Sequence, residues 1–220
     1  MPRELRRLAH ALALSTATVG GRPGWKGQRI VVGAVGVGTV AAAAGATRIL
    51  ADHRPARVLI VGVAGAVDKD LAIADVIAPR TVVDAASGAA WAPHGAGRAT
   101  TPARVRTLAT VPHFGAPLPA ETSAVDMETA AIAAQCERLG IPWDVRRAVS
   151  DLPGALHPTV PGLVGPDGRA DIPAVVRLLA RHPRQLAGLV RLGRDTTRAI
   201  KAVSASVLAE LRAMGLLETS

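Results

Sequence analysis

Three acidic residues in two short motifs have the clearest potential for acid–base chemistry in this sequence. Asp126 and Glu128 flank Met127, and Asp151 follows Ser150 directly after an apolar run. A carboxyl group can protonate a leaving group, and a carboxylate can accept hydrogen bonds from the hydroxyl groups of a substrate. Both motifs also have a structural interpretation, because acids stabilise the start of a helix and an Asp can simply cap a loop.

Apolar periodicity predicts the elements that must position these acids. We predict strands at Arg29–Val35, Arg57–Val63, Asp75–Val83, Arg106–Val111 and Ile141–Val149, and helices at Thr39–Ala51, Ser123–Leu139, Ile172–His182 and Gln185–Met214. Their order favours a single α/β domain with a central mixed, partly parallel, twisted sheet flanked by helices. Asp151 would then lie at the carboxyl end of a strand, where open α/β sheets bind ligands.

Composition excludes several classes of protein. A chain of 220 residues with 49% apolar residues is not wholly disordered. The single cysteine, Cys136, excludes an intramolecular disulfide framework and fits a reducing cytoplasm, and the six histidines lack metal-ligand spacing, so we expect no metal. We find no signal peptide and no membrane span. With only 2% aromatic residues, base stacking is disfavoured and we expect no nucleic-acid partner.

A glycine turn connects the first predicted strand to the first predicted helix. Gly36-x-Gly38-x-x-Ala41 formally fits a relaxed dinucleotide-binding fingerprint. The acid that would bind the ribose, about 20 residues further on, is absent, since Val61 to Val63 occupy that place. This favours a strand–helix turn that requires small residues, and we expect no nicotinamide or flavin cofactor.

Four segments of the chain form an ordered set of short motifs. They are Gly36-Val37-Gly38-Thr39-Val40-Ala41-Ala42, Val61-Gly62-Val63-Ala64-Gly65, Val125-Asp126-Met127-Glu128 and Arg147-Ala148-Val149-Ser150-Asp151. Taken in this order, they resemble the nucleoside phosphorylase/nucleosidase superfamily. Residues 165–169 (Gly-Pro-Asp-Gly-Arg) and the helices predicted after them are similar to the end of hopanoid-associated phosphorylases. The resemblance implies cleavage of the N-glycosidic bond of a 5′-substituted adenosine, with adenosylhopane as the expected substrate. Methylthioadenosine, adenosylhomocysteine and futalosine are the alternative substrates, and a catalytically impaired nucleoside-binding relative is the alternative class.

The resemblance also implies roles for individual residues. Asp151 would donate a proton or a hydrogen bond to N7 of adenine, with Ser150 positioning it, while Glu128 would bind the ribose hydroxyls and Met127 would pack against the sugar. Phe114 would stack on the base, unless it is an ordinary core aromatic. The remaining substrate-binding residues are Val63 and Gly65, and Gly36 and Gly38 would offer N–H groups to water or phosphate. The sequence leaves hydrolysis and phosphorolysis both open, so phosphate is a co-substrate only in the second case.

Glu4 is the residue that matches the acid with which the family orients the attacking water. The strand that precedes this acid in the family has no counterpart here, so the first strand of the fold is expected to be missing or to be encoded upstream of Met1. A Glu near a chain end is otherwise simply solvated. The role of Glu4 therefore depends on this strand.

A basic C-terminal extension completes the predicted organisation. We expect residues 1–171 to form the catalytic domain and residues 172–220 a helical extension packed on it. Between Ile172 and Lys201 there are seven basic residues and one acid, interleaved with leucines. Such a helix can contact an anionic membrane surface, or its basic face can simply be solvated. The resemblance also implies a homo-oligomer.

Overall fold

The computed structural model describes residues 9–95, 107–113, 115–154 and 186–216 of the chain. A small antiparallel sheet contains β1 (Ser15–Val19), β2 (Arg22–Lys26) and β3 (Val31–Val32). The main sheet has the order β5-β10-β4-β9-β8-β6-β7. Its strands are β4 (Val58–Ala66), β5 (Val76–Ile77), β6 (Thr81–Asp84), β7 (Ala90–Trp91), β8 (Thr107–Thr110), β9 (Thr122–Asp126) and β10 (Trp143–Asp151).

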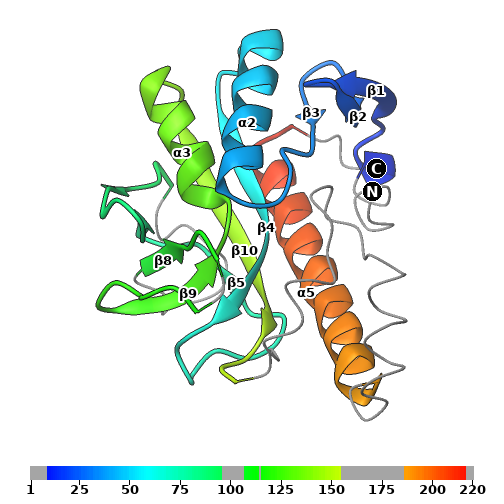
Figure 1. The fold of residues 1–220 in the computed structure, drawn as a ribbon. Coiled ribbons are helices and arrows are strands. Elements are labelled where there is room, and N and C mark those ends of the chain that lie inside the picture. Colours follow the sequence, from blue (N-terminus) through cyan, green and yellow to red (C-terminus); the bar gives the residue numbers. More distant parts are fainter. Residues whose placement is uncertain (1–8, 96–106, 114, 155–185, 217–220) are drawn as a thin grey trace.

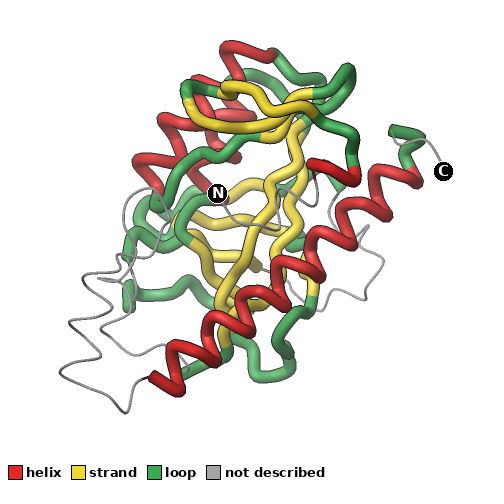
Figure 2. The backbone as a smooth tube through the Cα atoms, turned by 90° about the vertical axis from the view of Figure 1, so that its right-hand side faces the viewer, coloured by secondary structure: helices red, strands yellow, loops and turns green. Residues whose placement is uncertain are grey.

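Helices cover both faces of the main sheet (Figures 1 and 2). The α2 helix (Thr39–His53) and the α3 helix (Thr129–Arg138) pack beside each other on one face, and α5 (Leu186–Ala213) crosses the other. Successive residues of a strand point to opposite faces. On β4, Ile60 accordingly packs in the core under α2 and α3, whereas Val61 packs toward α5.

The predicted fold class is confirmed, because the main sheet is mixed and flanked by helices. β4 and β10 pair in parallel over nearly their whole length, as do β6 with β8 and β8 with β9, whereas β4 and β9 are antiparallel. The predicted helix 39–51 and the predicted strands 57–63, 106–111 and 141–149 are present with shifted ends. The predicted helix 185–214 corresponds to α5.

Three predicted elements have different bounds. The strand predicted at 29–35 is shorter in the structure, where it forms only β3. Glycines follow β3 at positions 33, 36 and 38, and the chain there is not a strand. The strand predicted at 75–83 divides into β5 and β6 around Pro79, which has no N–H group for a sheet. The helix predicted from Ser123 begins only at Thr129, because residues 122–126 pair as β9 between β4 and β8.

The α5 helix is fixed to the sheet by apolar contacts and by one buried ion pair. Ala199 and Val203 pack against Val76 and Ala148. The Arg146 side chain, 3% exposed, donates a hydrogen bond of 2.9 Å to Glu210 of the helix.

No helix among the described residues has the length and apolar character needed to cross a membrane. The domain boundary predicted at residue 171 and the helix predicted at 172–182 lie outside the described residues.

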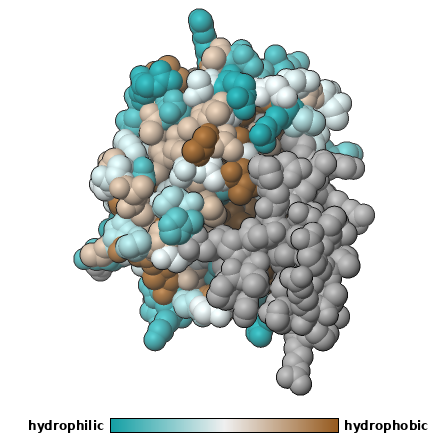
Figure 3. All heavy atoms as spheres, viewed as in Figure 1, coloured by the Kyte–Doolittle hydropathy of each residue, from teal (hydrophilic) through white to brown (hydrophobic). Residues whose placement is uncertain are grey.

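Polar side chains are prominent around the edge of the face seen in Figure 1, and apolar ones gather nearer its centre (Figure 3).

Candidate functional site

The register of the main sheet brings three of the predicted motifs together. In the pairing of β4 with its neighbours, Gly65 lies opposite Asp151 of β10 on one side and opposite Val125 of β9 on the other. Glu128 follows β9 by two residues and forms the N-cap of α3. The carboxyl end of β4 therefore lies between the two acidic motifs.

Asp151 lies at the end of β10, partly buried, and Ser150 donates a hydrogen bond of 2.6 Å to its Oδ1 atom. Burial raises the pKa of Asp151, and the hydrogen bond from Ser150 opposes this rise by stabilising the charged form. A Cβ atom on Gly65 would lie 2.6 Å from Oδ2 of Asp151. The absence of a side chain at Gly65 therefore provides the space for a carboxyl group that can act as a proton donor.

Glu128 connects the second acidic motif to the glycine turn. Its side chain is 19% exposed, and its Oε1 atom accepts a hydrogen bond of 2.9 Å from the backbone N–H of Gly38. Gly36 and Gly38 have φ angles of 115° and 83°, a region that residues with a Cβ atom rarely adopt. The turn therefore requires glycines to direct a backbone N–H group at Glu128.

Arg147 is a site residue to which the sequence analysis gave no role, although it stands in the motif that ends at Asp151. Its side chain is 6% exposed and lies 2.6 Å from Oδ2 of Asp126 and 4.0 Å from Oε2 of Glu128. Thr129 Oγ1 accepts two further hydrogen bonds from it, at 2.7 and 3.1 Å. A Cβ atom on Gly62 would collide with the Arg147 guanidinium group. The sequence signal was an arginine within an otherwise apolar predicted strand. In the structure, this arginine lies opposite Gly62 of β4.

Only some of the other predicted site residues lie near the two acidic motifs. Met127 lies half-buried between the two acids. The side chain of Val63 packs on the α5 face of the sheet, and only its carbonyl oxygen faces the group, at 3.4 Å from Arg147 Nη1. Glu4 and Phe114 lie outside the described residues.

A cavity of about 490 Å³ opens on the outer side of the glycine turn. Its lining includes Val37, Gly38, Val40 and the side chains of Arg22 and Arg48, but neither Glu128 nor Asp151. Val40 is 84% exposed there. Gly38, whose N–H group binds Glu128, is therefore the link between this cavity and the acidic motifs, and the cavity contains neither carboxyl group.

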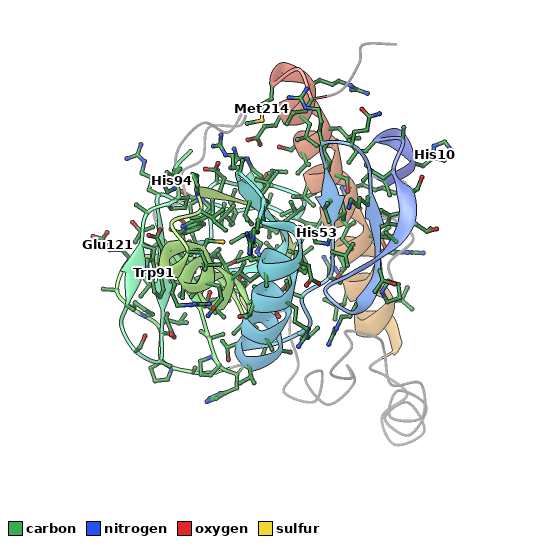
Figure 4. All side chains as sticks on the ribbon, turned by 90° about the horizontal axis from the view of Figure 1, so that it is seen from above. His10, His53, Trp91, His94, Glu121 and Met214 are labelled. Carbon is green, nitrogen blue, oxygen red and sulfur yellow. The ribbon has the colours of Figure 1, made fainter. Side chains whose placement is uncertain are left out.

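Metal-ligating and nucleophilic side chains do not gather within the described part of the chain. No group of three or more His, Cys, Asp or Glu residues there could hold a metal ion. His10, His53 and His94 lie far from one another (Figure 4). Cys136 is buried in the core, and burial, aided by the nearby charge of Glu137, raises its pKa to about 12. Its thiol is therefore a core group and a poor nucleophile at neutral pH.

Comparison with known proteins gives a family match and a shared fold. Residues 5–107 match the family model of the Phosphorylase superfamily. No curated protein shows significant similarity to the chain. A 5′-methylthioadenosine/S-adenosylhomocysteine nucleosidase from Helicobacter pylori has a TM-score of 0.68 and 17% identity, covering 97% of this chain and 95% of that chain. The Neisseria meningitidis enzyme of the same description, solved with methylthio-immucillin-A, has a TM-score of 0.65 and 21% identity, covering 94% and 93%. A futalosine hydrolase mutant from H. pylori has a TM-score of 0.56 and 20% identity, covering 68% and 86%.

The family match over residues 5–107 agrees with the superfamily that the sequence motifs resemble, whereas the solved structures show a shared fold. Neither singles out a hopanoid-associated member. The matched region contains the glycine turn and β4. Both acidic motifs follow it in the chain, so the roles that the resemblance implies for their residues stay predictions.

Proposed function

We propose that this protein cleaves the N-glycosidic bond of a 5′-substituted adenosine and releases adenine. The family match and the fold shared with solved nucleosidases support this activity. The observation that carries the proposal is the partly buried carboxyl group of Asp151, with its raised pKa, on the sheet edge that also bears the Glu128 motif.

The reaction builds positive charge on the ribose and negative charge on the departing purine, and the two acids are suited to these two charges. Asp151, protonated more readily than an exposed Asp, donates its proton or a hydrogen bond to N7 of adenine, and Ser150 orients it. Glu128 binds the ribose hydroxyls while the N–H of Gly38 holds its other oxygen. Met127 packs against the sugar, and Gly65 leaves room for the acid.

The group that attacks the ribose is water or phosphate in this proposal. Glu4 would orient a water molecule, and the N–H groups around Gly36 and Gly38 would bind either acceptor. Product analysis with and without inorganic phosphate distinguishes the two reactions. Hydrolysis yields the 5-substituted ribose at a rate that does not depend on phosphate, whereas phosphorolysis requires phosphate and yields the 1-phosphate of the 5-substituted ribose. No other co-substrate or cofactor is proposed.

The experiment for the activity measures adenine released from 5′-methylthioadenosine by the wild type and by Asp151→Asn. Loss of the acid should reduce turnover at least about a hundredfold. Asp144→Asn is the matched control, because Asp144 is a buried carboxylate on the same strand that pairs with Arg57. Turnover in Asp151→Asn equal to that of Asp144→Asn would contradict the assigned acid. Adenosine binding without adenine release by the wild type would instead assign a nucleoside-binding protein without this activity.

Within this class, we propose adenosylhopane as the substrate of a cytoplasmic enzyme that contacts the membrane surface. Support comes from the tail that is similar to hopanoid-associated phosphorylases and from a basic row on α5. Arg191, Arg194, Arg198 and Lys201 are exposed and recur every three or four residues, so they share one face of the helix. Such a row is attracted to anionic lipid headgroups.

Two measurements test these finer statements. The first is the value of kcat/KM for adenosylhopane in vesicles, which should exceed the value for 5′-methylthioadenosine. The second is sedimentation of the full chain with vesicles of phosphatidylglycerol and phosphatidylcholine, which should fall when the four basic residues are replaced by Gln. Equal recovery of both proteins in the supernatant contradicts the membrane contact. The proposed homo-oligomer is checked by light scattering on the eluting protein.

A further inference from the structure

Asp126 is a buried carboxylate, and both of its oxygens accept hydrogen bonds from neighbouring residues. The residue is 6% exposed. Oδ1 accepts a hydrogen bond of 2.7 Å from the hydroxyl of Thr110, and Oδ2 accepts one from the hydroxyl of Thr129. The backbone N–H of Thr129 donates to both oxygens, at 3.3 and 3.2 Å, and Arg147 completes the set at 2.6 Å. Both oxygens of the carboxylate are therefore bound by protein groups, so we do not expect it to bind a ligand directly.

These contacts act on Glu128 from two directions. Thr129 is the first residue of α3 and Glu128 is its N-cap, so the bonds from Thr129 to Asp126 fix the backbone that carries Glu128. The ion pair with Asp126 also holds the Arg147 guanidinium group 4.0 Å from Oε2 of Glu128, beyond hydrogen-bond distance. The described residues leave Oε2 without a hydrogen bond, whereas Oε1 is bound by Gly38.

We infer that Asp126 is a positioning residue that keeps Glu128 available to the ribose by holding the Arg147 guanidinium group. This inference rests on the function proposed above and deepens it. Two carboxylates lie near the same nitrogen of one guanidinium group, since Nη2 of Arg147 is 2.6 Å from Asp126 and 4.0 Å from Glu128. Thr129 and Val63 accept hydrogen bonds from three of its other N–H groups. Without the negative charge of Asp126, the nearest alternative partner of Arg147 is Glu128.

Asp126→Asn tests this inference, because Asn keeps the shape of the side chain and removes its charge. Arg147 should then pair with Oε2 of Glu128, and a ribose hydroxyl would have to displace it. We expect the KM for 5′-methylthioadenosine to rise about tenfold or more, the equivalent of one charge-assisted hydrogen bond, with kcat changed much less. Asp144→Asn removes an equally buried charge from an ion pair with Arg57 and should leave KM unchanged.

A double-mutant cycle separates positioning from general destabilisation. In the Glu128→Gln background, the carboxylate that could pair with Arg147 is absent, so adding Asp126→Asn should change KM little further. Additive effects on KM would overturn the inference, as would an unchanged KM in the single variant. If Asp126→Asn does not fold, the double variant Asp126→Asn/Arg147→Gln takes its place, because it removes the guanidinium group together with the charge that holds it. Glu128 then has no cation to pair with, so KM should stay close to that of the wild type. A raised KM in this variant would overturn the inference.

A crystal structure of Asp126→Asn tests the inference independently of the proposed activity. If the wild type releases no adenine, the proposed function fails, but the distance from Arg147 to Glu128 can still be measured. We expect it to shorten from 4.0 Å to hydrogen-bond length. An Arg147 side chain that keeps its wild-type position in the variant would overturn the inference whatever the wild type catalyses.

Discussion

Replacing Gly65 by alanine should reduce kcat about a hundredfold while leaving the protein folded. The added Cβ atom would lie 2.6 Å from Oδ2 of Asp151, whereas an ordinary contact is 3.4 Å or longer, so the carboxyl group must retreat by about 0.8 Å. A displacement of about 1 Å in a reacting group can cost about 10²-fold in rate. The end of a side chain moves more easily than backbone, so the free energy of unfolding should fall by only about 1 kcal/mol.

The assay is adenine release from 5′-methylthioadenosine at saturating substrate, together with a thermal unfolding curve for each variant. Gly24→Ala is the matched control, because a Cβ atom there would be as crowded, 2.6 Å from the carbonyl oxygen of Val32, but within the small antiparallel sheet. It should lower the melting temperature and keep kcat. The steric argument would be refuted if Gly65→Ala retained the kcat of Gly24→Ala, because Asp151 would then tolerate the displacement or not be the acid.

Three further predictions concern protonation and the docking of α5. Ser150→Ala removes the bond that stabilises the charged form of Asp151, so the pKa of Asp151 should rise further and the alkaline limb of the kcat–pH profile should move to higher pH. Because the pKa of Asp151 is raised in the folded protein, its contribution to stability is present below its ordinary pKa and is lost as the pH rises through the raised one. Asp151→Asn should accordingly melt at a higher temperature than the wild type at pH 7, and the difference should shrink as the pH is lowered below that pKa. Glu210→Gln should lower the free energy of unfolding by about 1–3 kcal/mol in urea titrations, because the partner Arg146 is buried. Asp195→Asn alters a 4.0 Å pair on the same helix whose partner Arg191 is exposed, so it should change the free energy of unfolding by about 0.5 kcal/mol or less.

The sequence allowed prediction of the elements whose signals are local. The helix that became α2 was predicted from an alanine-rich segment after a glycine turn. The strands that became β4 and β10 were predicted from apolar runs, since buried parallel strands have this pattern. The segment 123–126 was assigned to a helix because its pairing partners are distant in sequence. Val125 lies opposite Gly65, and that contact overrides the local preference of the segment. The hairpin β1–β2 was missed, although Gly20 and Gly21 at its turn both have positive φ angles.

The candidate site was predictable in its acids and less so in their partners. Asp151 and Glu128 were identifiable because each stands in a motif at the end of an element. The hydrogen bond from Gly38 to Glu128 joins residues 90 positions apart in the sequence, so no local motif could predict it. Arg147 was overlooked because a basic residue is usually solvated, and its burial depends on the space that Gly62 leaves on the adjacent strand.

Adjacent arginines on β10 explain why the site and the α5 helix depend on the same strand register. Side chains alternate along a strand, so Arg146 points toward α5 and binds Glu210, whereas Arg147 points toward α3 and binds Asp126. A slip of one residue in the pairing of β10 with β4 would exchange the two faces and bury each guanidinium group without its acid. It would also move Asp151 away from Gly65, the residue that leaves space for its carboxyl group. The two buried ion pairs therefore help to define the single register in which the acid of β10 and the acid beside α3 can face one substrate.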